Sequence, residues 1–110
     1  MKLDMSLNNY ALYYGCIIAE LGTAPYQRKV ITTPMVDAVQ IIVPNLRKIL
    51  SSSFFKNSDS ITIFGSTPVW VYLCCLRTLH HKFSYIYYDD GKNIPVLIYG
   101  HSVPGMDDEF

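Results

Sequence analysis

Residues 60–73, SITIFGSTPVWVYL, join a short apolar segment to the start of a helix. Ile61–Phe64 is rich in β-branched and aromatic residues and ends at Gly65, which is typical of a short buried strand. Thr67 and Pro68 are residue types preferred at a helix N-cap and at the first helical position. The pattern predicts a strand-to-helix turn, which is the connection that recurs in α/β domains.

This predicted turn also suits an anion. A glycine, two hydroxyl side chains and a helix start bring together free backbone N–H groups, the positive end of a helix dipole and the donors Ser66 and Thr67. A phosphate group fits such a place, although an ordinary capped helix without a ligand has the same pattern. Trp70 lies one turn into the helix, where it either stacks on a base or, as is commoner on an apolar helix, belongs to the core.

The segments after this turn predict a core helix and a hairpin. Residues 69–82, VWVYLCCLRTLHHK, are apolar on nearly every side until Arg77, so we expect a helix covered over most of its surface. Phe83–Tyr88 and Ile94–Tyr99 are predicted strands, and Asp89–Asn93 is the turn between them, with an Asp-Gly pair typical of hairpins. A proline near the start of the last strand predicts that it lies at a sheet edge.

The amino-terminal half predicts the first strands and the first helix. Tyr10–Leu21, YALYYGCIIAEL, is predicted to be a strand because it is aromatic and β-branched, and Lys29–Thr32 is a second short candidate. A helix is expected to begin at Thr33 and Pro34 and to be kinked or broken at Pro44. The predicted main order is β-α-β-α-β-β, which is an α/β fold.

Length and composition favour one small domain that associates with a partner. With 110 residues, 50% of them hydrophobic, residues 1–110 are expected to form a single domain, and residues 103–110 a frayed tail. Nine tyrosines and five phenylalanines provide more aromatic surface than so small a domain covers alone. We therefore expect a homodimer.

Charge and cysteine content narrow the function classes. Nine basic residues balance nine acidic ones, so the overall positive field that draws long duplex DNA to a protein is absent. Three cysteines, two of them adjacent in an apolar helix, are typical of buried thiols in a reducing compartment. The start of the chain does not resemble a signal peptide, and the longest apolar run, Pro68–Leu76, is too short to span a membrane. These features predict a cytoplasmic location.

A second group of residues has side chains that bind divalent metals or move protons: His80, His81, Asp89, Asp90 and His101. Two histidines at a helix end also interact favourably with its dipole, and two aspartates also form turns, so the group by itself is unspecific. The predicted helix runs back from the Ser66 end of the sheet, so the histidines should lie at the opposite end from Ser66 and Asp89. A site that combines them would require two subunits stacked head to tail.

Three segments, GSTPVWVYLCCLRTLHH, FSYIYYDDG and VLIYGHS, resemble the Csx-three family of type III CRISPR-associated ring nucleases. The shared pattern is a Gly-x-x-Pro-hydrophobic-Trp helix start, a His-bearing helix end, a strand ending in Asp and a strand ending in His. It covers about residues 58–103. The resemblance implies a compact Rossmann-like dimer that binds cyclic tetra-adenylate and cleaves it in a manganese-dependent reaction within stacked dimers.

The resemblance also implies roles for individual residues. The ligand-binding end would be lined by Gly65, Ser66, Thr67, Pro68 and Trp70. Catalysis or binding of the Mn²⁺ ion would involve His80, Asp89 and His101. Two family arginines are absent, because Ser66 follows the glycine and Asp90-Gly91 replaces a Pro-Arg pair. A sensor that binds the messenger without cutting it, and an oligomeric scaffold without a small ligand, remain as alternatives.

Overall fold

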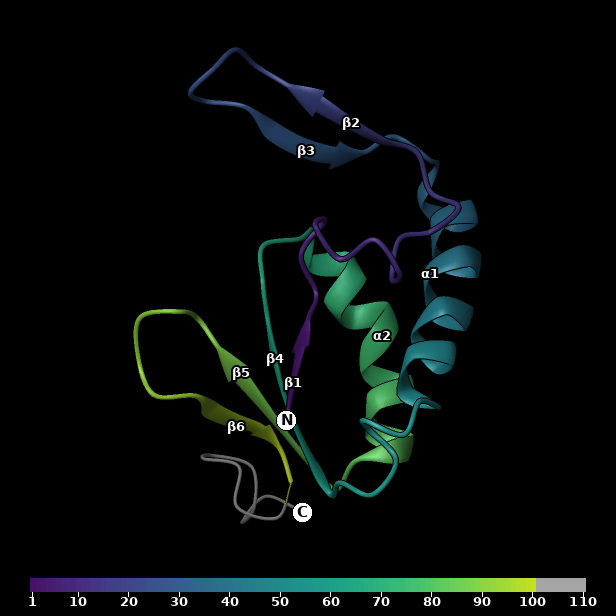
Figure 1. The fold of residues 1–110 in the computed structure, drawn as a ribbon, viewed down its shortest axis with the longest axis vertical. Helices are drawn as coiled ribbons and strands as arrows, with labels where there is room; N and C mark the ends of the chain where they lie inside the picture. Colours follow the sequence, from purple (N-terminus) through teal and green to yellow (C-terminus); the bar gives the residue numbers. More distant parts are fainter. Residues whose placement is uncertain (101–110) are drawn as a thin grey trace.

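Four strands form one mixed β-sheet in the order β1-β4-β5-β6 (Figure 1). The computed structural model describes residues 1–100, and the strands of this sheet are β1 Lys2–Asp4, β4 Ser60–Phe64, β5 Tyr85–Asp89 and β6 Val96–Tyr99. Strands β1, β4 and β5 are parallel, whereas β6 runs antiparallel to β5 and lies at the edge. The predicted edge position of the last strand is therefore confirmed. Strand β1 was not predicted, because three residues are too few to show an alternating pattern.

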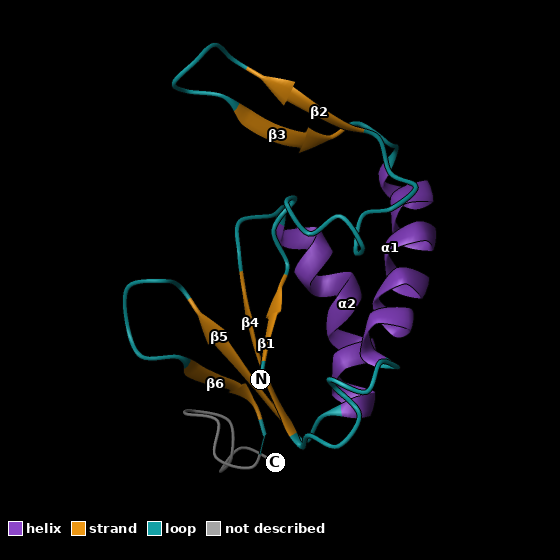
Figure 2. Cartoon of the chain, in the orientation of Figure 1, coloured by secondary structure: helices purple, strands orange, loops and turns teal. Residues whose placement is uncertain are grey.

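Two helices, α1 (Met35–Leu50) and α2 (Val69–Lys82), pack on one face of this sheet (Figure 2). They share that face because successive right-handed crossovers in the same direction place their helices on the same side. Ile61 and Ile63 point toward the helices and are 1% and 2% exposed, whereas Thr62 between them is only half-buried. The side chains that meet between the layers form one core: Leu3, Ala38, Ile42, Leu46, Ile61, Ile63, Val71, Cys75, Leu79 and Ile86.

A separate hairpin of β2 (Ile18–Leu21) and β3 (Arg28–Ile31) stands beyond the carboxyl ends of the parallel strands (Figure 1). Its base is tied to the start of α1. The Thr32 N–H donates to the Ile17 carbonyl at 2.9 Å, and the Ile17 N–H donates to Thr33 Oγ1 at 2.7 Å. These bonds fix the hairpin where α1 begins, on the side of the molecule where β4 ends.

The predicted strand Tyr10–Leu21 is wrong in its first part, because residues 10–15 form consecutive turns and only the last four residues are β2. The turns need no strand partner, since the Asn45 side chain of α1 supplies hydrogen bonds to them. Its Nδ2 donates to the Leu12 carbonyl at 3.0 Å and to the Tyr14 carbonyl at 2.8 Å. A side chain 33 positions away in the sequence thus overrides the local β propensity.

The predicted helix caps are also wrong. Pro34 and Pro68 occupy the N-cap positions, and neither helix start has a side-chain cap hydrogen bond. The hydroxyl of Thr33 is used by the hairpin base, and that of Thr67 contacts the hydroxyl of Tyr13 at 2.8 Å. Tertiary partners therefore compete successfully with capping for these two threonines.

Helix α1 runs unbroken past Pro44, so the predicted break is absent. Pro44 has no N–H to donate to the Gln40 carbonyl. Both residues are exposed. Water can therefore take the place of the missing donor. The buried face of the helix continues through this point with Ile42 and Leu46, which are 0% exposed.

Helix α2 buries one stripe rather than most of its surface. Val71, Cys75 and Leu79 are fully buried, but Val69 and Leu73 are 72% and 65% exposed. Within the described residues the expected cover for this helix is therefore missing. The three cysteines are free thiols. None of the helices in residues 1–100 has the length and apolar character needed to cross a bilayer.

Candidate functional site

The loop after β4 begins at a position where only glycine fits. Gly65 has a φ of +111°, and a Cβ atom there would lie 2.6 Å from the Ser6 backbone nitrogen and 2.7 Å from Asp4 Oδ1. The Tyr72 hydroxyl of α2 donates to the Gly65 carbonyl. Close approach of these backbones places the carboxyl ends of β1 and β4 side by side, which is where α/β sheets commonly bind ligands.

The Thr67 hydroxyl, predicted as a phosphate donor, is already engaged. Burial raises the pKa of the Tyr13 hydroxyl well above its usual range, so this group is neutral and carries one proton. It donates that proton to the Met5 carbonyl at 2.5 Å. Thr67 must then be the donor in the 2.8 Å contact between the two hydroxyls. The interaction positions the loop and leaves Thr67 without a hydrogen for a ligand.

Ser66 is the free donor of this loop. It is exposed, and its hydroxyl makes no hydrogen bond with any other part of residues 1–100. It also lines two neighbouring cavities, one on each side of the loop. Of the two hydroxyls predicted from the sequence, the structure therefore leaves only Ser66 available to a phosphate.

The larger cavity, which we call the carboxyl-end cleft, has a volume of about 800 Å³. It lies between the start of α2, the loop after β4 and the β5–β6 hairpin. Its walls are Ile63, Phe64, Gly65, Ser66, Thr67, Val69, Tyr72, Leu73, Leu76, Tyr88, Asp89, Asp90, Gly91 and Ile98. The cleft thus combines apolar and aromatic surface with a few polar groups, as small-molecule sites do.

Two carboxylates stand at the rim of the carboxyl-end cleft. Asp89 Oδ1 accepts the Gly91 N–H at 2.8 Å, and its Oδ2 lies 3.4 Å from the Lys2 ammonium. The N–H groups of Lys92 and Asn93 lower the pKa of Asp90. Asp90 is therefore ionised at neutral pH. The rim carries negative charge that a phosphate ligand would have to avoid or to bridge through a cation.

The smaller cavity, which we call the hairpin cavity, contains two basic residues that are not among the predicted site residues. It measures about 420 Å³, and Arg28 and Lys29 of β3 line it together with Glu20 of β2 and with Ser66. Lys29 Nζ donates to Asn8 Oδ1 at 2.9 Å, whereas Arg28 is exposed. Nothing local in the sequence marks these two residues, because only the fold of the hairpin brings them to the Ser66 loop.

The histidines lie at the other end of the sheet. His80 and His81 have ring centroids 5.1 Å apart, and the His80 ring is 4.7 Å from that of Tyr99. They line a cavity of about 350 Å³ with Gly100. This histidine cavity and the carboxyl-end cleft share no residue, so the predicted separation of His80 from Asp89 is confirmed. The predicted site residue His101 lies outside the described residues.

The described residues do not form a metal site within one chain. Residues 1–100 contain no group of three or more His, Cys, Asp or Glu side chains placed to hold one ion. The Mn²⁺ ion implied by the family resemblance therefore does not fit any single-chain donor set in this part of the protein.

Trp70 and Pro68 do not line the carboxyl-end cleft. Trp70 is half-buried and packs against the hydrophobic core. Pro68 forms the N-cap of α2 with a φ of −55°. The structure therefore favours the core interpretation of Trp70 over the stacking interpretation.

Comparisons with protein-family models, with curated proteins and with solved structures find no match to this chain. The family resemblance consequently rests on the sequence motifs alone, and the geometry of the two ends of the sheet is independent of it.

Proposed function

We propose that this protein binds a cyclic oligoadenylate at the carboxyl-end cleft and hydrolyses it in head-to-tail stacks of cytoplasmic, Rossmann-like dimers. The observation that carries the proposal is the position of Ser66. This free hydroxyl lies at the carboxyl end of β4, between the apolar cleft and the basic residues of the hairpin cavity.

Binding of phosphates is supported by the neighbours of Ser66. Arg28 and Lys29 bring two positive charges, and Glu20 one negative charge, to the cavity beside the loop from which the family arginine is missing. The net positive charge partly compensates for the missing arginine, because positive charge near a site that excludes water favours a phosphate. Tyr72 and Tyr88 offer aromatic surface in the cleft to the adenine bases.

Catalysis between subunits is supported by the position of His80. A proton-transferring imidazole must come within hydrogen-bond distance of the reacting group, directly or through one water. His80 is at the opposite end of the sheet from Ser66, so its imidazole cannot serve a ligand held at Ser66 of the same chain. In a head-to-tail stack, the histidine cavity of one dimer faces the ligand held by the next.

Dimer formation is supported by apolar surface that the described residues leave open. Neither helix covers the second face of the sheet (Figure 2), and Val69 and Leu73, which also form part of the wall of the carboxyl-end cleft, are exposed. Burial of such surface in a partner contributes about 25 cal/mol for each Å² removed from water.

The direct test is incubation of the purified protein with cyclic tetra-adenylate, with Mn²⁺ or with EDTA, followed by separation of the products. We expect linear products and a thermal shift with the wild-type protein. Ser66→Asp should abolish the shift by charge repulsion. Ser53→Asp, which adds the same charge to an exposed loop far from the cleft, should retain it. An intact ring after long incubation, together with no thermal shift, would refute the proposal.

A sensor that binds the messenger without cutting it is the second candidate. It is favoured by the two absent family arginines and by the absence of a group of three or more metal-binding side chains within residues 1–100. A thermal shift with cyclic tetra-adenylate but no turnover under any metal condition would select the sensor over the nuclease.

A further inference from the structure

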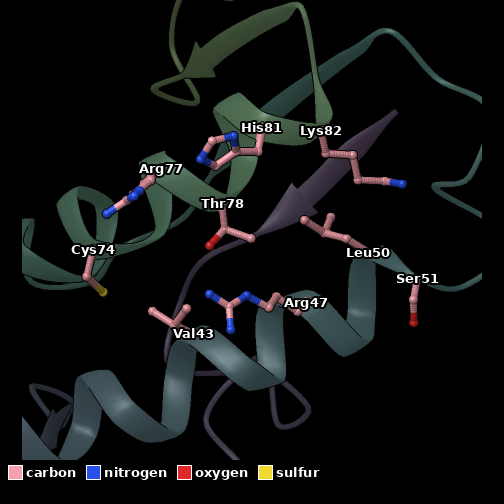
Figure 3. Close-up of a pocket in the computed structure, with 9 residues that line it drawn as sticks. All are labelled: Val43, Arg47, Leu50, Ser51, Cys74, Arg77, Thr78, His81 and Lys82. Atoms are coloured by element: carbon pink, nitrogen blue, oxygen red, sulfur yellow. The ribbon is translucent and has the colours of Figure 1, made fainter.

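A second groove lies between the carboxyl-terminal halves of α1 and α2, and Figure 3 shows the side chains that form it. We call it the helix groove. Its volume is about 710 Å³, within the usual range of small-molecule sites. It is lined by Val43, Arg47, Leu50 and Ser51 on the α1 side and by Cys74, Arg77, Thr78, His81 and Lys82 on the α2 side. None of these residues lines the carboxyl-end cleft.

The charge of the helix groove has one sign. Arg47, Arg77 and Lys82 are three of the nine basic residues of the chain, and no acidic side chain is among the residues that line the groove. None of the three forms an ion pair with the described part of the chain, where the one ion pair found joins Lys2 to Asp89. A neutral protein thus concentrates three basic side chains without an ion pair in residues 1–100 in one concavity, which raises the local concentration of anions.

Helix dipoles explain only part of this arrangement. Lys82 is in the last turn of α2 and Arg47 is near the end of α1, where positive charge stabilises the helix. Arg77, however, lies outside the last turn of its helix. Arg77 is exposed and lines the groove together with Arg47 and Lys82, and the dipole of its own helix does not account for its position.

The polar groups are arranged on two facing helices. On α1, Arg47 and Ser51 are one turn apart, and on α2 Arg77 and His81 have the same spacing. Figure 3 shows Arg47 and Thr78 extending into the space between the helices from opposite sides. A ligand in the groove therefore meets a guanidinium donor from α1 and a hydroxyl donor from α2.

The walls of the helix groove also contain apolar surface. Val43, Leu50 and Cys74 lie among the cationic residues and would contact the uncharged part of a ligand. Guanidinium groups bind phosphate oxygens in a bidentate manner, and their planes also stack on bases. We propose that the helix groove binds a ligand of nucleotide size that carries phosphate groups. The proposal is independent of the function proposed for the carboxyl-end cleft.

The probes are ATP without metal, inorganic pyrophosphate and adenosine, titrated into the full chain by isothermal calorimetry at constant ionic strength. We expect saturable binding of ATP and no binding of adenosine. If pyrophosphate binds as tightly as ATP, the groove prefers an inorganic phosphate as its ligand. If pyrophosphate binds more weakly, the groove prefers a nucleotide. Both results support a phosphate site. Adenosine that binds as tightly as ATP, or no saturable ATP binding at millimolar concentration, overturns it.

Charge-neutralising variants locate the site. Arg47→Gln and Arg77→Gln should each weaken ATP binding roughly tenfold, because each removes charge-assisted hydrogen bonds to phosphate. Lys48→Gln is the matched control, since Lys48 is the exposed neighbour of Arg47 on the same helix and lies outside the groove. An equal loss of affinity in Lys48→Gln overturns the assignment. A loss of ATP affinity in Ser66→Asp that Arg47→Gln and Arg77→Gln do not show would place ATP in the carboxyl-end cleft and overturn it as well. Circular dichroism checks that each variant is folded.

Discussion

Replacement of Tyr13 by phenylalanine should destabilise the protein by about 2 to 3 kcal/mol. The Tyr13 hydroxyl is the hydrogen-bond donor to the Met5 carbonyl, at 2.5 Å, and Met5 is 0% exposed. Removal of the hydroxyl leaves this buried carbonyl without its partner, which costs roughly 1 to 3 kcal/mol. The lost bond to Thr67 adds less, because Thr67 is only half-buried and its hydroxyl can turn toward water.

Urea denaturation followed by circular dichroism measures the free energy of unfolding of this variant. The control is Tyr14→Phe, whose side chain is 64% exposed and whose loss of a hydroxyl should change stability by about 0.5 kcal/mol or less. Tyr13→Phe also frees the Thr67 hydroxyl, so the affinity for an anion at the Ser66 loop should not fall in this variant. Equal stability of Tyr13→Phe and the wild type would refute the hydrogen bonds from Tyr13 to Met5 and Thr67.

Tyr13 should also make the stability of the folded protein depend on pH in the alkaline range. Burial raises the pKa of Tyr13 in the folded protein above its unfolded value of about 10, so the native state binds its proton more tightly. Its contribution to stability is complete below about pH 10 and is lost as the pH rises above that value. Tyr13→Phe should therefore lose less stability than the wild type between about pH 9 and pH 12 in urea titrations.

Three further outcomes are expected. Gly65→Ala should lower the free energy of unfolding by about 2 to 3 kcal/mol, because of backbone strain and the clash with Ser6. Gly91→Ala should lower it less, because Gly91 also has a positive φ, +82°, but has nothing within 4 Å of the added Cβ atom. Equal losses in the two variants would contradict the close approach at Gly65. Trp70→Ala should lower the free energy of unfolding by about 3 kcal/mol, and an unchanged denaturation midpoint would rule out its core role. An equimolar mixture of the Ser66→Asp and His80→Ala proteins should regain part of the ring-opening activity that each variant lacks alone. This activity should fall when the mixture is diluted. A mixture without activity would argue against a site shared between dimers.

Local patterns were sufficient to predict the strand-to-helix turn and the carboxy-terminal hairpin. Strand β4, Gly65 and helix α2 follow one another directly, so hydrophobic periodicity and the glycine and proline positions define them without distant contacts. The same holds for the turn between β5 and β6. The separation of Asp89 from His80 followed from the direction of consecutive elements alone.

Contacts between distant segments decided the remaining features. Asn45 of α1 converts a strongly β-like segment into turns, and Tyr13 takes the hydroxyl of Thr67 away from both capping and ligand binding. Arg28 and Ser66 line one cavity, and Arg47 and Arg77 another, only because of how the hairpin and the two helices pack. Sequence periodicity specifies which face of an element is apolar, but the elements that face one another, and therefore the charges that converge, are set only when the whole core has formed.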